Sequence, residues 1–85
     1  MPYQVIVAQS AAKEIKQLPK PDIQAIWTKI NSLANNPRPV GSKKLVGSSN
    51  KWRIRHGDYR IIYTIDDNIL TVSIVKVKHR KDVYE

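Results

Sequence analysis

Residues 51–65 read KWRIRHGDYRIIYTI, and this stretch decides the fold. Polar and apolar side chains alternate along two β-branched and aromatic runs, as in half-buried strands, and the runs flank a Gly-Asp pair suited to a tight turn. If Gly57 and Asp58 form a two-residue turn, Arg55 lies opposite Arg60 on the neighbouring strand. The stretch therefore predicts a β-hairpin with one apolar face and one face that carries arginines.

A third strand is expected to follow at residues 69–77. Asp67 and Asn68 both tolerate positive φ and suit a second tight turn, which would place Ile61 opposite Ile74. One face of this meander would then collect the apolar side chains Trp52, Ile54, Ile61, Tyr63, Ile65, Leu70, Val72 and Ile74. The other face would receive Arg53, Arg55 and Arg60, together with Val75 and Val77. A bulge in either hairpin would change this register.

The first half of the chain predicts one strand and two helices. Residues 3–7 are β-branched and aromatic and are expected to form a strand. A helix with Ser10 as its N-cap should end at Pro19, and an amphipathic helix should begin at Pro21. The resulting order, β-α-α-β-β-β, is α+β: a helical hairpin on one face of a mostly antiparallel four-stranded sheet. Eighty-five residues predict a single domain over residues 1–85.

The charge of the chain points to a polyanionic partner. Fifteen Lys and Arg residues face seven Asp and Glu, giving a formal net charge of +8. An imbalance of this size predicts attraction to nucleic acid or to an acidic protein. The cations gather over residues 38–60, partly in an expected basic loop at 37–50, and again over residues 76–81. The candidate lysines for binding RNA are Lys43, Lys44, Lys51, Lys78 and Lys81.

Composition also argues against several classes of site. The chain has no cysteine, hence no disulfide framework or cysteine-ligated zinc, and two histidines are too few for a histidine-rich metal site. No metal or cofactor is therefore expected. No apolar run approaches the roughly 20 residues of a membrane span, and no charged segment at the N-terminus precedes a long apolar stretch. The sequence predicts a cytoplasmic protein that does not bind a membrane.

Three arginines on one face of a sheet repel one another, and packing does not explain their presence there. Arg55 opposite Arg60, with Arg53 two residues along, places like charges side by side, which lowers stability. A bound anion such as phosphate would remove the conflict, because guanidinium presents a fork of donors that matches phosphate oxygens. Solvated arginines that splay apart on an open face are the alternative.

Four strings of the sequence resemble the RelE family of toxin–antitoxin toxins. They are KLVG at residues 44–47, WRIR at 52–55, GDYRIIY at 57–63 and VKHRKDVY at 77–84. The resemblance covers nearly the whole chain and implies the same order of elements. It also implies an endoribonuclease, an mRNA interferase that cuts messenger RNA in the ribosomal A site by attack of the 2′-hydroxyl, leaving a 2′,3′-cyclic phosphate. A cognate antitoxin is the implied protein partner.

The resemblance carries over roles to individual residues. Arg53 and Arg55 match the basic pair that flanks the attacking hydroxyl, where some relatives have lysine. An arginine, whose pKa exceeds about 12, is a poor base at pH 7, so charge stabilisation is the expected role of this pair. Arg60 matches the arginine that stabilises the phosphate, and Arg80 the residue near the leaving group. Tyr84 matches a terminal tyrosine that orients or stacks on a base.

His79 is the candidate for proton transfer, because free imidazole has a pKa of about 6.5. A surface histidine at the end of a strand is the alternative. Strict alternation would put His79 on the arginine face and turn Arg80 toward the helices. The resemblance therefore requires the last strand to end or twist before Arg80.

Two other functions stay open from the sequence. ParE toxins share the fold and act on DNA gyrase without the nuclease residues. An inactive RNA-binding relative would also have the same fold, because a fold does not determine a function. The presence of Arg60, Arg80 and Tyr84 together favours the nuclease.

Overall fold

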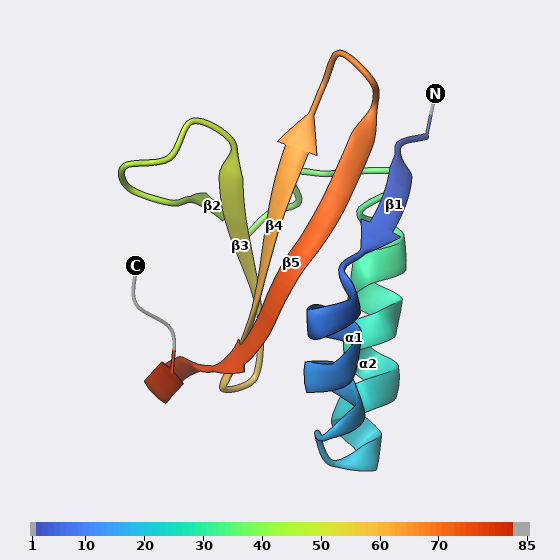
Figure 1. Ribbon diagram of the computed structural model, residues 1–85, viewed down its shortest axis with the longest axis vertical. Coiled ribbons are helices and arrows are strands. Elements are labelled where there is room, and N and C mark those ends of the chain that lie inside the picture. The colour runs from blue at the N-terminus through green and yellow to red at the C-terminus, as the bar shows by residue number, and fades with distance from the viewer. Residues whose placement is uncertain (1, 83–85) are drawn as a thin grey trace.

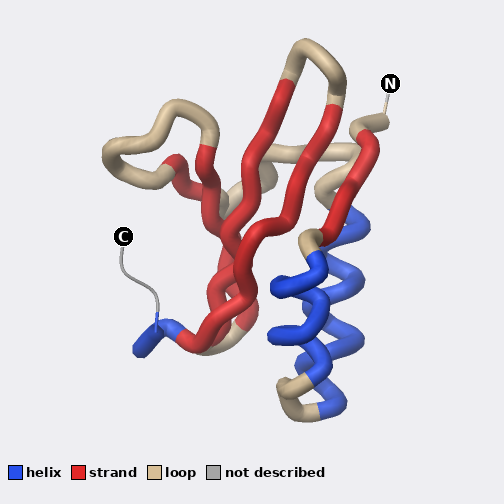
Figure 2. Tube along the Cα trace, in the orientation of Figure 1, coloured by secondary structure: helices blue, strands red, loops and turns tan. Residues whose placement is uncertain are grey.

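The computed structural model describes residues 2–82, which form two helices packed on one mixed sheet (Figure 1). Within these residues the sheet has five strands in the order β1-β5-β4-β3-β2, and the helical hairpin covers one of its faces (Figures 1 and 2). The elements are β1 (Gln4–Val7), α1 (Gln9–Lys16), α2 (Lys20–Ser32), β2 (Lys43–Lys44), β3 (Lys51–His56), β4 (Tyr59–Asp66), β5 (Thr71–His79) and a 3-10 turn, η1 (Arg80–Asp82). The α+β class and the order of the long elements are confirmed.

The expected count of four strands was one too low. Lys43 and Lys44, assigned to a loop, form the two-residue strand β2 and pair antiparallel with Arg53 and Trp52 of β3. At the opposite edge β1 pairs with β5 in parallel, so the sheet is mixed, with antiparallel pairing elsewhere.

The two helices are separated by prolines, as expected. Pro19 is the N-cap residue of α2, and Pro21 lies in its first turn, where a missing N–H leaves no hydrogen bond unmade. Ser10, however, is not an N-cap. The N–H of Ala8 still donates to the carbonyl of Ile74 at 2.9 Å as β1 ends, and α1 begins directly afterwards at Gln9 without a side-chain cap. The strand thus passes into the helix too early for Ser10 to cap it.

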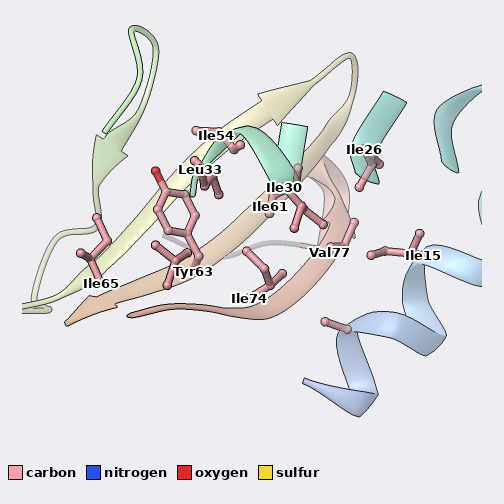
Figure 3. Packing of buried hydrophobic residues seen from close by; sticks show 12 residues of the cluster. Ile15, Ile26, Ile30, Leu33, Ile54, Ile61, Tyr63, Ile65, Ile74 and Val77 are labelled. Carbon is pink, nitrogen blue, oxygen red and sulfur yellow. The ribbon is translucent and has the colours of Figure 1, made fainter. Parts of the chain in front are cut away.

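The core lies between the hairpin and the sheet (Figure 3). The helices contribute Ala11, Ile15, Ile26 and Ile30, and Leu33 joins them directly after α2. The sheet contributes Ile54, Ile61, Tyr63, Ile65, Val72, Ile74 and Val77. Most of this set was predicted from alternation, and Trp52 packs against it while partly buried. Leu70, by contrast, lies in a turn at φ +49° rather than in a strand.

A longer turn and a bulge together change the predicted register of the β4–β5 pair. The connection spans residues 67–70 instead of two residues, because the Asp66 carboxylate accepts hydrogen bonds from the N–H groups of Asn68 (3.0 Å) and Ile69 (3.3 Å). Lengthening the turn by two residues preserves alternation, so Tyr63 pairs with Ile74 and both stay in the core. The register shifts again between Tyr63 and Ile62.

From Ile62 back toward Tyr59, the side chains of the paired part of β5 alternate in the opposite sense to the prediction. Ile62 pairs with Lys76 although Tyr63 pairs with Ile74, which leaves Val75 as the extra residue of the bulge. Ile61 therefore pairs with Val77, not with Ile74, and Val77 is buried in the core at 1% exposure. The prediction that Val77 lies on the arginine face was wrong for this reason.

Helix side chains cover the parts of the sheet edges that β1 and β2 do not reach. The Glu14 carboxylate accepts a hydrogen bond from the Val77 N–H at 2.9 Å and lies 2.7 Å from the Lys78 ammonium. On the other edge the Lys29 ammonium donates to the carbonyl oxygen of Arg55 at 2.5 Å. Backbone groups that would be open to another strand are thereby occupied.

Candidate functional site

Two cavities lie along β3, and Arg55 lines both of them. The smaller, which we call the arginine pocket, has a volume of about 220 Å³ and is lined by Arg55, Gly57, Asp58, Arg60 and Arg80. The larger, which we call the β3-edge pocket, has a volume of about 530 Å³. Its lining consists of Lys29, residues 39–41, Lys43 and residues 53–55.

The arginine pocket is built by three separate elements. Arg55 of β3 lies directly opposite Arg60 of β4, as the two-residue turn predicts. Arg80 is the first residue of η1, and its N–H donates to the carbonyl of Asp58 at 2.7 Å, which brings it to the β3–β4 turn. The strand therefore ends before Arg80, as the family resemblance requires. Three guanidinium groups around one small cavity favour an anion with several oxygens.

Asp58 is the acidic member of the arginine pocket. Its carboxylate lies 3.8 Å from Nε of Arg80 and 4.0 Å from Nε2 of His79. Both Asp58 and Arg80 are more than half exposed, so solvent screens the ion pair and leaves it weak. The backbone hydrogen bond, not the ion pair, therefore fixes the position of Arg80.

His79 lies beside the arginine pocket and does not line it. The residue pairs with Tyr59, and the two rings meet edge to face with centroids 5.6 Å apart. Because the bulge inverts alternation, Lys78 rather than His79 pairs with Arg60, and the expectation that His79 shares the arginine face was wrong. The Lys81 N–H donates to Nδ1 of His79 at 3.2 Å. In the neutral ring the proton is therefore on Nε2, toward Asp58.

Arg53 does not line the arginine pocket. It lines the β3-edge pocket, pairs with Lys43 on one side and Ile62 on the other, and is only 4% exposed. The structure thus brings together Arg55, Arg60 and Arg80 and places Arg53 in the adjoining cavity.

The candidate lysines have different surroundings. Lys43, Lys44, Lys51 and Lys81 are exposed. Lys78 is half-buried, and the hydrogen bond to Glu14 raises the pKa of its ammonium group. Tyr84 lies outside the described residues.

Two residues near the site were not predicted from the sequence. Nothing in the sequence indicates that Lys29 of α2 contacts β3. Sequence reasoning also passed over Asp58 as a turn residue, although its position two residues before Arg60 placed it near the site.

A cluster of side chains anchors the loop that forms one wall of the β3-edge pocket. The Arg38 guanidinium forms a bidentate hydrogen bond with the Asp67 carboxylate, from Nη2 to Oδ2 at 2.8 Å and from Nη1 to Oδ1 at 3.3 Å. The same guanidinium lies 5.2 Å from the ring centroid of Trp52. The hydrogen bond from Arg38 is the main cause of the lowered pKa of Asp67, and a bond from Tyr3 adds to it.

Tyr63 fixes the same loop from inside the core. Its hydroxyl donates to the carbonyl of Pro37 at 2.8 Å, and burial raises the pKa of Tyr63 to about 12. The hydroxyl therefore keeps its proton and its role as a donor throughout the neutral range. Residues 37 and 38 are thus fastened immediately before the segment that lines the pocket.

Over residues 2–82, no helix combines the length and apolar character needed to cross a membrane. In the same part of the chain, the acidic and histidine side chains form no group of three or more that could hold a metal ion.

Comparisons with known proteins give the family. The model of the ParE toxin family, "ParE toxin of type II toxin-antitoxin system, parDE", matches residues 5–84. Toxin RelG of Mycobacterium tuberculosis is 33% identical over 85 residues, which cover 99% of this chain and 98% of that protein. The archaeal RelE–RelB complex from Pyrococcus horikoshii contains a similar chain, with TM-score 0.85 and 28% identity over 98% of this chain and 100% of that one. The toxin–antitoxin complex RelBE2 from M. tuberculosis contains another similar chain, with TM-score 0.82 and 30% identity over 94% of this chain and 100% of that one. The chain therefore belongs to the RelE/ParE superfamily of toxins from type II toxin–antitoxin systems.

Proposed function

We propose that this toxin is a ribosome-dependent mRNA endonuclease that inhibits translation. The observation that carries the proposal is the arginine pocket, in which Arg55, Arg60 and Arg80 surround one cavity of about 220 Å³. Guanidinium groups match phosphate oxygens and do not lose their charge at neutral pH. Three of them around one phosphate would stabilise the additional negative charge of a pentacovalent phosphorane.

The proposed reaction is a transesterification within the RNA. The 2′-oxygen attacks the adjacent phosphorus, the bond from phosphorus to the 5′-oxygen breaks, and the upstream fragment keeps a 2′,3′-cyclic phosphate. The 2′-hydroxyl loses a proton and the departing 5′-oxygen gains one. Arg55 and Arg60 act by charge, Arg53 adds charge from the adjoining cavity, and Arg80 lies toward the leaving oxygen.

His79 is the proposed proton carrier, and the structure limits how it could act. Because Nδ1 accepts a hydrogen bond from the Lys81 backbone, proton exchange with RNA has to use Nε2. This atom faces Asp58, which lines the arginine pocket. Tyr84, outside the described residues, is proposed to stack on or orient a base.

The exposed lysines are proposed to attract the RNA backbone. Lys43, Lys44, Lys51 and Lys81 offer charges that pair with phosphates at the surface and make binding dependent on salt. Lys78 is also proposed as an RNA contact, but its ammonium already lies 2.7 Å from Glu14, so we expect a smaller contribution from it.

A cognate antitoxin is the proposed protein partner. Similar chains of known structure are RelE toxins in complex with RelB antitoxins. For a toxin of net charge +8, we propose an acidic, partly disordered partner that folds as it binds. Action on translating ribosomes would take place in the cytoplasm.

The proposal is tested by adding the protein to translating ribosomes and mapping the ends of the message. We expect new 5′ ends within A-site codons for the wild type and none for Arg60→Ala. The match to the ParE model favours a second candidate, a non-nuclease toxin that acts on DNA gyrase. Inhibition of gyrase supercoiling without new message ends would establish that alternative and reject the nuclease. An inactive RNA-binding relative would bind RNA and give neither result.

A further inference from the structure

We propose that the β3-edge pocket is a nucleobase subsite, which receives the base of a nucleotide whose phosphate occupies the arginine pocket. The inference rests on the proposed function and adds a specificity-determining site to it. Its starting observation is that the two cavities share Arg55, so this one residue would contact an occupant of either. A nucleotide has this shape: an anionic group joined through a ribose to a flat, largely apolar ring.

The size and lining of the pocket suit a base. Its volume of about 530 Å³ lies within the roughly 300–1,000 Å³ typical of small-molecule sites. Pro39, Val40 and Ile54 supply apolar surface, and Arg55 supplies a guanidinium group, on which RNA bases commonly stack. Val40 is fully exposed, an apolar side chain at the rim of a cavity with nothing packed over it among the described residues.

The pocket is also preformed. Arg38 holds the preceding loop through Asp67 and Trp52, and Lys29 of α2 is bonded to the carbonyl of Arg55. Walls that are already in place lose little conformational entropy when a ligand binds.

The polar groups of the pocket indicate which bases fit. Lys29 and Lys43 have ammonium groups, which donate hydrogen bonds and cannot accept them. Guanine presents O6 and N7 as acceptors on one edge, whereas adenine presents an amino donor beside N7. The pocket is therefore expected to prefer guanine to adenine.

The test is calorimetric titration of the free protein with four probes: inorganic phosphate, ribose 5-phosphate, GMP and AMP. We expect GMP to bind at least tenfold more tightly than ribose 5-phosphate. Val40→Trp, which fills the pocket, should remove this gain and leave the affinity for ribose 5-phosphate unchanged. Val46→Trp is the matched control, because Val46 is similarly exposed and does not line the pocket. Lys43→Met should reduce the preference for GMP over AMP.

The outcomes separate this inference from the proposed function. Phosphate binding that depends on Arg60, with GMP no tighter than ribose 5-phosphate, would overturn the subsite and leave the anion site intact. A wild-type protein that binds none of the four probes would remove the basis of both. Equal loss in Val40→Trp and Val46→Trp would also overturn the subsite. So would a Val40→Trp variant that keeps its GMP affinity but binds its antitoxin less tightly, because the pocket would then serve the protein partner.

Discussion

Asp58 and Arg80 make two contacts between the β3–β4 turn and η1. The Arg80 N–H donates to the Asp58 carbonyl at 2.7 Å, and Nε of Arg80 lies 3.8 Å from the Asp58 carboxylate. The first contact sets the position of the backbone at Arg80, and the second places a negative charge inside the arginine pocket. Substitution of the side chain alone separates these effects, because the backbone hydrogen bond remains.

Asp58→Asn should therefore tighten the binding of inorganic phosphate by about two- to fivefold. An exposed ion pair contributes up to about 1 kcal/mol, and its loss frees the Arg80 charge for the ligand. Calorimetric titration measures the change, with Asp82→Asn as a control that removes one exposed carboxylate of η1 outside the pocket lining. Weaker binding in Asp58→Asn would instead mean that the carboxylate positions Arg80.

Arg60→Ala should lower the rate of message cleavage by on the order of a hundredfold or more, comparable to the loss of one transition-state donor. Arg60→Lys should recover only part of the rate, because an ammonium restores the charge without the two-pronged fork. The rate is measured on programmed ribosomes, and urea denaturation checks that each variant is folded. Full cleavage by folded Arg60→Ala would reject the assignment.

His79→Gln distinguishes proton transfer from a positioning role. If His79 carries a proton, the pH profile of the wild-type cleavage rate has an inflection that His79→Gln flattens. Arg80→Lys should slow the reaction without moving the inflection. An unchanged pH profile in His79→Gln would leave the imidazole as the acceptor for the Lys81 N–H and nothing more.

Acid should release the anchored loop. The bond from Arg38 lowers the pKa of Asp67 below its ordinary value of 3.8, so the stabilisation is present above that pH and is lost as pH falls through the lowered pKa. In a Trp27→Phe background, the fluorescence of Trp52, which lies under Arg38, should report the transition. Asp67→Asn should lack it, and an identical acid titration in both proteins would refute this account.

The bulge predicts unequal effects of two neighbouring valines on stability. Val77→Ala should lower the free energy of unfolding by roughly 2 kcal/mol, since a fully buried side chain is truncated. Val75→Ala, at the half-buried extra residue, should lower it by less than about 1 kcal/mol. Urea denaturation measures both. Equal losses would contradict the register, because the sequence alone placed the two valines on the same face.

The parts of the fold that could be predicted are those determined by local chemistry. The Gly57-Asp58 turn sets the register of β3 and β4, and Arg55 therefore faces Arg60 as expected. The β4–β5 register could not be predicted, because it depends on the Asp66 carboxylate closing a longer turn and on one extra residue further along. Two consecutive lysines carry no alternation, so β2 gave no signal either. The contact between Lys29 and Arg55 is tertiary and joins residues 26 positions apart.

The bulge at Val75 also divides the last hairpin into two parts that differ in their tolerance of length changes. On the turn side, adding or removing two residues keeps the phase of the strands, and the pockets at the far end would not be affected. On the other side, deleting Val75 would remove the bulge and leave Val77 opposite Ile61, whereas a single deletion between Val77 and Arg80 would break the phase and shift the Arg80 backbone by half a strand repeat. Among homologous toxins, variation in length should therefore gather at residues 67–70 and be absent from residues 77–80.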